Sequence, residues 1–167
     1  MVAGTIEGLG PDTAGFARGD RVAFPLPIGG VPEHDSLVLS IDTLVGVPRG
    51  VAEQQAADLL VPGIVARALL RQLRPMGDGD RIHLAFDGEL LRAVVEAWVL
   101  ARGGILVDSA ADADIVYDET ARQLAVREAS LRQGRMQEAA ADVFMTMRAG
   151  VFDDITVPRR GAHTIAA

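Results

Sequence analysis

Two residue types that carry much of enzyme chemistry, cysteine and lysine, are absent from this chain of 167 residues. Without cysteine the chain can form no disulfide, no thiolate nucleophile and no zinc site built on thiolates. Without lysine no side chain can form a Schiff base with a carbonyl substrate. All 16 basic residues are therefore arginines, and they stand against 23 acidic residues, which gives a formal net charge of −7.

The charge balance and the scarcity of aromatic residues both argue against a nucleic-acid partner. Phosphate contacts need clustered cations, and this acidic chain has no basic block. Aromatic residues make up only 4% of the sequence, which excludes extensive stacking surfaces for bases. The three histidines, His34, His83 and His163, lack the spacing of a metal site, so we expect no bound metal.

Long apolar runs are also missing. Arginines at positions 67, 71, 92 and 102 interrupt every candidate before it reaches the length of a membrane span. The N-terminus has no basic stretch followed by an apolar one, so we expect no secretion signal. These absences predict a soluble, cytoplasmic protein that binds neither membranes nor nucleic acid.

The first half of the chain changes character near residue 50. Residues 1–50 place apolar runs such as "RVAFPLPIGG" and "SLVLSIDTLVGVP" between glycine and proline, which predicts short strands of a partial β-barrel. Residues 51–73 have helical spacing, but Pro62 and Gly63 separate two apolar faces and predict two short helices. The turn-rich "RPMGDGD" closes this part. We therefore predict three regions, at 1–50, 51–80 and 81–167.

The third region has the pattern of an α/β fold. Ile82–Phe86 and Ile105–Val107 are predicted strands, and the amphipathic stretch Glu89–Ala101 between them is a predicted helix. Strand, turn, helix and strand in this order form a βαβ unit of the nucleotide-binding kind. A strand within 112–118 and two helices, at 120–132 and 136–149, complete the predicted elements.

The turn that opens this unit is unusual because it is acidic. It reads Phe86-Asp87-Gly88-Glu89, whereas a phosphate cradle would offer glycines and open backbone amides. Asp87 and Glu89 could act together as a general acid and base. The alternative is structural, with Asp87 capping the helix and Glu89 solvated in its first turn. Both alternatives stay open at this point.

Tyr117 is the third candidate catalytic residue. It stands among acids that include Asp108, Asp112 and Asp118, and with one of them it could move a proton on an enolisable carbonyl. The alternative is that these acids are turn formers and strand-end residues of an acidic protein. The predicted catalytic set is therefore Asp87, Glu89 and Tyr117.

Several segments resemble the quinone oxidoreductases of the medium-chain dehydrogenase/reductase superfamily. "GTIEGLGPDTAGFARGDRVAF" is similar to the family's loop and "GDRV" strand, and "LLVPGIVARALLRQLRPMGDGDRIHLAF" to its helical crossover and first Rossmann strand. "ARGGILVDSA" and "ADIVYD" resemble later strands, and "MQEAAADVFMTMRAGVFDDITV" the C-terminal helix and returning strand. The resemblance implies an α/β fold in which a partial GroES-like β region precedes a reduced Rossmann-like sheet.

The resemblance also shows what this chain has changed. In the family a glycine-rich turn after the first Rossmann strand holds the cofactor pyrophosphate. Here Asp87 and Glu89 stand in that turn, so we expect these acids to occupy the anion site and redox activity to be lost. The resemblance further implies a truncated member, without the family's first strands before Met1 and with sheet strands skipped between Asp108 and Asp112.

Three functions are consistent with these patterns. The first is a non-redox descendant that binds a small hydrophobic, polyketide-like molecule, without cofactor, in a cleft between the helical crossover and the βαβ unit, as a cyclase or isomerase. The second is an NAD(P)H-dependent quinone or enoyl reductase, for which NADPH is the expected cofactor. The third is a non-catalytic interaction module. In each case we expect a homodimer, because a sheet that lacks strands leaves edges to be covered.

Overall fold

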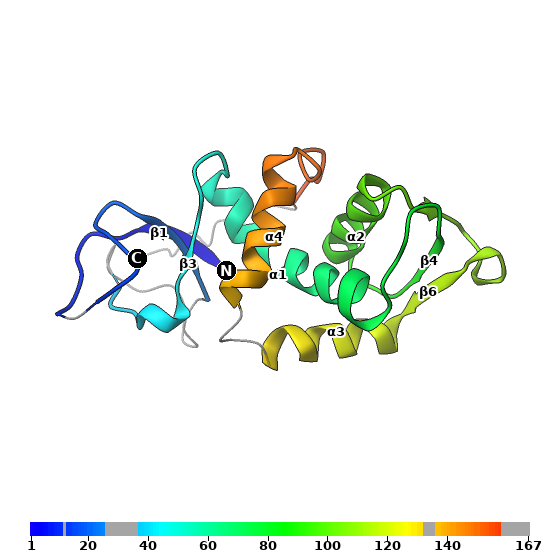
Figure 1. Cartoon of the computed structure of the whole chain (residues 1–167), viewed down its shortest axis with the longest axis horizontal. Helices are drawn as coiled ribbons and strands as arrows, with labels where there is room; N and C mark the ends of the chain where they lie inside the picture. The colour runs from blue at the N-terminus through cyan, green and yellow to red at the C-terminus, as the bar shows by residue number, and fades with distance from the viewer. Residues whose placement is uncertain (12, 26–36, 132–135, 158–167) are drawn as a thin grey trace, which may run out of the picture.

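The computed structural model describes residues 1–11, 13–25, 37–131 and 136–157 of the chain. It has the predicted α/β fold, with an antiparallel sheet at one end, a parallel sheet at the other and helices between them (Figure 1). In the described part of the chain, no helix is long and apolar enough to cross a membrane.

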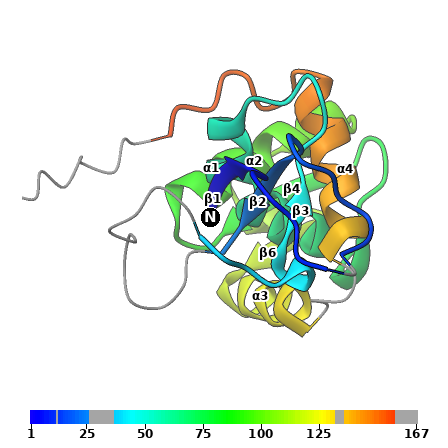
Figure 2. The ribbon, with the colours of Figure 1, turned by 90° about the vertical axis from the view of Figure 1, so that its left-hand side faces the viewer.

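The antiparallel sheet consists of β1 (Val2–Thr5), β2 (Arg21–Phe24) and β3 (Val45–Gly46), in that order. The central strand β2 has three buried residues in a row, because helix α1 covers the sheet (Figure 2). The predicted strand between residues 37 and 47 is largely a short 3₁₀ turn, η1 (Ile41–Thr43), and only its end pairs with β2.

Helix α1 (Glu53–Ala68) is the centre of the fold. It contacts β1, β2 and all three other helices, and it continues into a π-helical turn, η2 (Leu69–Leu73). The predicted break at Pro62 was therefore wrong. A proline inside a helix removes one backbone hydrogen bond. Here burial of eight α1 residues against the surrounding elements outweighs that loss.

Gly63 lies where helix α4 (Met136–Arg148) packs against α1. A Cβ atom at this glycine would lie 2.5 Å from Cγ1 of Val143, so only glycine permits this close approach. Beside this contact, Asp142 of α4 accepts hydrogen bonds from Arg67 Nε at 2.6 Å and from Arg71 Nη1 at 3.0 Å. The Pro62–Gly63 pair thus serves a helix crossing and does not end a helix.

The parallel sheet confirms the predicted βαβ unit. Strand β4 (Arg81–Ala85) leads into α2 (Glu89–Ala101), which returns the chain to β5 (Ile105–Leu106). On the other side of β4 lies β6 (Ile115–Asp118), so the strand order is β5-β4-β6. The chain returns from β5 to β6 through a short connection that contains the 3₁₀ turn η3 (Ala110–Asp112).

Two further predictions for the second half of the chain, a helix after β6 and a strand after α4, have different outcomes. Helix α3 (Glu119–Leu131) follows β6 directly and matches the predicted helix. The returning strand expected after α4 is not found, because residues 151–157 contain turns and no strand in the described structure. Phe152 holds this segment instead. Its buried ring packs edge-on against Trp98, with 5.7 Å between ring centres.

One hydrophobic core joins the two sheets. Its buried side chains run from Ala23 and Val45 in the antiparallel sheet, through α1, to Ile82 and Tyr117 in the parallel sheet. The three predicted regions, 1–50, 51–80 and 81–167, all contribute to it. The boundaries between these regions, near residues 50 and 80, therefore stay predictions.

Candidate functional site

The first candidate site lies where the strand order of the parallel sheet reverses. Helix α2 carries the chain from β4 to β5, while β6 lies on the opposite side of β4. In such sheets ligands bind at this point, beyond the carboxyl ends of the strands. A hollow of about 250 Å³, here called the switch-point hollow, is found there, lined by Leu84, Ala85, Phe86, Asp87, Arg92 and Glu119.

The turn from β4 to α2 does not take the predicted form. Gly88 is the residue that precedes α2, its φ is +114°, and no side chain caps the helix. The alternative that Asp87 caps α2 was therefore wrong. A positive φ strains residues with a Cβ, so glycine is needed at position 88 by the turn itself. Asp87 and Glu89, on either side of it, are both exposed.

The carboxylate that meets this turn comes from α3. Glu119 lines the switch-point hollow together with Asp87, and Arg122 donates to both of its carboxylate oxygens. The hydrogen bond from Arg122 is the main reason that the pKa of Glu119 is lowered. We predicted Asp87 and Glu89 as the occupants of the anion site; of these two acids only Asp87 lines the switch-point hollow, and Glu119 lines it as well.

The arginines near the switch-point hollow are already hydrogen-bonded to acids or to backbone carbonyls. Arg92 donates from Nε to Glu96 Oε1 at 2.8 Å and from Nη1 to the carbonyl of Leu84 at 2.9 Å. Arg122 is paired with Glu119, and Asp87 further raises the pKa of this arginine. A dinucleotide brings phosphate charges that need open amides and open cations. The residues of this hollow therefore do not fit a dinucleotide.

Tyr117 lies away from both of the other predicted catalytic residues. Its side chain is fully buried, and its hydroxyl donates to the carbonyl of Arg74 at 2.6 Å. Burial raises the pKa of this hydroxyl to about 12. Tyr117 lines neither of the hollows found among the described residues. The structure thus gives Tyr117 a place in the core, and it does not bring the predicted set of three together.

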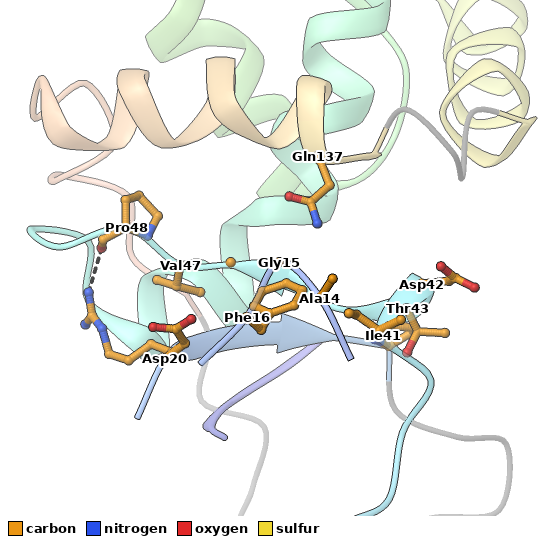
Figure 3. A pocket seen from close by; sticks show the side chains of 13 residues that line it. Ala14, Gly15, Phe16, Asp20, Ile41, Asp42, Thr43, Val47, Pro48 and Gln137 are labelled. Atoms are coloured by element: carbon orange, nitrogen blue, oxygen red, sulfur yellow. Dashed lines mark hydrogen bonds between the residues drawn. The ribbon is translucent and has the colours of Figure 1, made fainter. Parts of the chain in front are cut away.

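A larger hollow lies over the antiparallel sheet. It has a volume of about 1100 Å³, and the start of α4 overhangs it (Figure 3). The predicted cleft between the helical crossover and the βαβ unit was wrong in position, because α1 packs directly on α2 and α3 there. This second site, here called the sheet hollow, is lined by Ala14, Gly15, Phe16, Asp20, Arg21, Pro25, Ile41, Asp42, Thr43, Gly46, Val47, Pro48 and Gln137.

The polar groups of the sheet hollow are mostly acceptors. Arg21 is its one cation among the described lining residues, and its guanidinium donates to the carbonyls of Pro48 and Val51 at 2.6 and 3.0 Å. Gln137 donates to the carbonyl of Leu44 at 3.2 Å, which leaves its amide oxygen as an acceptor. Asp20 adds a carboxylate, held by the backbone amide of Ala17 at 2.7 Å.

Sequence reasoning missed the residues of both hollows for different reasons. The sheet hollow joins residues 14–48 to Gln137, and no local pattern relates such distant positions. Glu119 could have been found from topology, since it directly follows a strand predicted to be parallel to the first one. His83 has a structural role, because its Nδ1 lies 3.0 Å from the carbonyl of Val107. His34 and His163 lie outside the described residues.

Comparison with known proteins gives a partial match. Over 108 residues the chain is 35% identical to a quinone oxidoreductase from Pseudomonas aeruginosa. The match covers 63% of this chain and 32% of that relative, so the chain spans about a third of the length of the curated relative. No family model matches the chain.

Solved structures agree with the fold. Human synaptic vesicle membrane protein VAT-1 homolog-like protein superposes with a TM-score of 0.63 at 12% identity, over 89% of this chain and 66% of that one. Escherichia coli quinone oxidoreductase complexed with NADPH gives 0.50 at 17% identity, over 76% and 36%. The predicted relationship to quinone oxidoreductases and the predicted fold class are thus confirmed.

The similarity to quinone oxidoreductases and the residues near the turn after β4 lead to different expectations about a cofactor. One protein of similar fold is a complex with NADPH. The arginines beside the turn after β4, in contrast, are already paired with acids. A fold likeness at 17% identity carries no ligand contacts with it.

Proposed function

We propose that this relative of the quinone oxidoreductases binds a small hydrophobic molecule in the sheet hollow and uses no nicotinamide cofactor. The observation that carries the proposal is the sheet hollow itself, at about 1100 Å³. Small-molecule sites commonly have volumes of roughly 300 to 1,000 Å³, with mostly apolar walls and a few polar groups. Phe16, Ile41 and Val47 provide such walls here (Figure 3).

The ligand's charge follows from the polar groups of the hollow. Asp20 and Asp42 are both acidic, while the guanidinium of Arg21 is directed to backbone carbonyls. An anionic ligand would therefore meet repulsion without a compensating cation. A neutral molecule with a hydroxyl or another donor group suits the amide oxygen of Gln137 and the carboxylate of Asp20. A hydrophobic, polyketide-like compound belongs to this class.

The chemistry that we assign to such a ligand is cyclisation or isomerisation without a cofactor. A shaped apolar site can hold a flexible molecule near its reactive conformation, which lowers the entropy that the reaction must lose. An acid–base step would fall to Asp20, whose carboxylate lines the hollow in a fixed position. It would not fall to Asp87, Glu89 or Tyr117, which do not line the sheet hollow.

Replacing Gly46 with tryptophan tests the sheet hollow. A Cβ at Gly46 points toward Phe16 Cε1, 3.6 Å away, so a large side chain can enter the hollow without a backbone clash. We expect a neutral hydrophobic dye, Nile red, to bind this variant at least tenfold more weakly, as measured by fluorescence titration. Gly8→Trp is the matched control, because nothing lies within 4 Å of a Cβ there. Equal binding by both variants would contradict the proposal.

An NADPH-dependent reductase is the second candidate, favoured by the 35% identity to a quinone oxidoreductase. Titration of the chain with NADPH, followed by nicotinamide fluorescence, separates the two candidates. The absence of micromolar binding supports the cofactor-free function. Micromolar binding would instead support the NADPH-dependent reductase.

A homodimer is the assembly that we propose. Strand β5 lies at one edge of the parallel sheet, and Ile105 in this strand is 51% exposed. The opposite edge is partly covered, because Arg74 Nη1 donates to the carbonyl of Val116 in β6 at 2.9 Å. Exposed strand edges and apolar side chains are commonly covered by a partner. Sedimentation equilibrium should give twice the monomer mass at micromolar concentration, and less of the dimer for Ile105→Glu; a stable monomer contradicts this proposal.

A further inference from the structure

We infer that two copies of this chain associate through the uncovered face of the parallel sheet, packed face to face with their strands running in opposite directions. The inference rests on the homodimer proposed above, and it names the surface and the symmetry of that dimer. Pairing of the two copies through the β5 edge alone would leave this face uncovered.

The uncovered face exists because the sheet packs on one side only. Ile82 and Leu84 of β4 are buried in the core, and the residues that alternate with them point to the other face and are not buried. Helices α1 and α2 lie on the core side of the sheet (Figure 1). Strand pairing defines the residues of the other side, here called the open face, as Arg81, His83 and Ala85 of β4, Ile105 of β5, and Val116 and Asp118 of β6.

A sheet of this kind requires a cover on both faces. Parallel sheets occur almost only where other elements bury them from both sides. Within the described residues, the open face has no helix packed on it, and it presents the apolar side chains of Ile105 and Val116. Covering the open face therefore removes apolar surface from water, which favours association.

Opposite charges stand at the two ends of the open face. Arg81 begins β4, and its side chain is 48% exposed. Asp118 ends β6, is exposed, and pairs with Ala85 at the end of β4. Four residues along a strand span about 13 Å. Arg81 and Asp118 of one copy are therefore too far apart to pair with each other.

Symmetry brings these two charges together between copies. Sheets that pack face to face keep their strands nearly aligned, and a two-fold contact uses the same surface on both chains. With the axis across the strands, the start of β4 lies over the end of the partner's β4, beside the partner's Asp118. Arg81 of each copy then meets an acid, twice in the dimer. With the axis along the strands, the two Arg81 side chains would meet and repel each other, so the first arrangement is favoured.

Local contacts leave both charges available to a partner. Arg81 Nη2 lies 4.0 Å from Asp112 Oδ1, and this pair is weak because both side chains are largely exposed. Asp118 accepts the amide of Ala121 through Oδ1 at 2.8 Å, which leaves its second carboxylate oxygen as an acceptor. The neighbouring acid Asp114 is held in its own copy, since its Oδ2 accepts the backbone amide of Arg81 at 2.9 Å.

Exchange of the two charges tests the symmetry. Arg81→Asp puts two acids at each contact and should weaken the dimer at least tenfold, measured by sedimentation equilibrium. Asp118→Arg should also weaken it, although this change lowers the net negative charge and would by net charge alone favour association. Both changes in one chain restore opposite charges between copies, so the dissociation constant should return to within threefold of the wild type. The recovery must come from contacts between copies, because the two positions lie about 13 Å apart within one copy.

Val116→Glu separates the open face from the β5 edge. Val116 lies in β6, on the opposite side of β4 from β5. A glutamate there should weaken a face-to-face dimer at least tenfold and leave a dimer paired through β5 unchanged. Leu124→Glu is the matched control, because Leu124 is 47% exposed on α3 and does not belong to the open face. It should change the dissociation constant less than threefold. Thermal unfolding confirms that each variant is folded.

The inference is overturned if the doubly exchanged chain dimerises no better than Arg81→Asp, or if Val116→Glu leaves the dimer intact. Those results would leave the proposed homodimer standing with another interface. A wild type that stays monomeric would contradict the proposed homodimer itself, and the inference with it. The two failures are therefore distinguishable.

Discussion

Replacement of Gly63 with alanine should lower the free energy of unfolding by about 3 kcal/mol, near the upper end for overpacked cores. In an exposed helix the same change is stabilising by about 1 kcal/mol, since alanine is the better helix former. Here the new Cβ would lie 2.5 and 3.1 Å from the two methyl carbons of Val143. Val143 is fully buried, so the helices must separate or its side chain must leave its rotamer. Urea unfolding followed by the fluorescence of Trp98, the single tryptophan, measures the loss.

A double-mutant cycle with Val143→Ala supplies the control. Alanine at position 143 removes the two methyl groups and leaves its own Cβ 3.4 Å from the new atom, which is ordinary contact. Each single change should be destabilising, one by overpacking and the other by a cavity. The double variant should lose less than the sum of the two, with a coupling energy of roughly 1 kcal/mol or more. Additive losses would show that Gly63 is not required by the crossing of α1 and α4.

Raising the pH from about 10 to 12 should destabilise the protein through Tyr117. The tyrosine hydroxyl has a pKa of about 12 in the folded chain, against an ordinary value of 10.0, because burial disfavours the phenolate. The unfolded chain therefore loses this proton first. The contribution of the neutral hydroxyl is complete below pH 10 and disappears as the pH rises through 12, up to roughly 3 kcal/mol.

Two spectroscopic measurements check this prediction. Tyr117 is the only tyrosine, so phenolate absorbance near 295 nm reports this single group. The native protein should titrate near pH 12, and the protein in urea near pH 10. Tyr117→Phe should be less stable at pH 7 by about 1 to 2 kcal/mol, through loss of the hydrogen bond to Arg74. Its stability should also fall less than that of the wild type between pH 10 and 12. A native titration midpoint near pH 10 would be incompatible with the buried position of the hydroxyl.

The sequence predicted best where local pattern and burial agree. The helix Glu89–Ala101 was predicted with its observed bounds, because its buried residues, Val94, Val95, Trp98 and Val99, form one stripe. Gly103, with a φ of +78°, follows the C-terminal cap residue Arg102 and ends the helix. The parallel arrangement of β4 and β5 followed from the same unit. These features depend on neighbours within a few residues.

The predictions failed where distant contacts decide the structure. Pro62 and Gly63 indicate a break by local rules, and only the packing of α4 on α1 explains why the helix continues. The acids of the turn at 86–89 were the visible candidates for the anion site. Glu119 lines the same hollow as Asp87 from 32 positions further along the chain, counted from Asp87 to Glu119. No local pattern could indicate that neighbour.

Tyr117 shows the limit of functional inference from residue type. A tyrosine among acids suggests proton transfer, yet alternation along β6 buries this side chain at the level of Leu84 in β4. Its hydroxyl needs a partner in that position and finds the carbonyl of Arg74. The acids that surround Tyr117 in sequence point outward from the same strand and its turns, and Asp118 serves as a helix cap.

The short return from β5 to β6 has a consequence for how this architecture can change over evolution. Leu106 at the end of β5 and Ile115 at the start of β6 both pair with Ile82, so the chain leaves and re-enters the sheet at the same level. The two points are separated by two strand spacings, about 10 Å. Whole strand-and-helix modules can therefore be gained or lost through residues 107–114 while β4 keeps both of its neighbours. In the loop of residues 107–114, strands can therefore be added to or removed from the sheet while the pairing of β4 with β5 and β6 is kept.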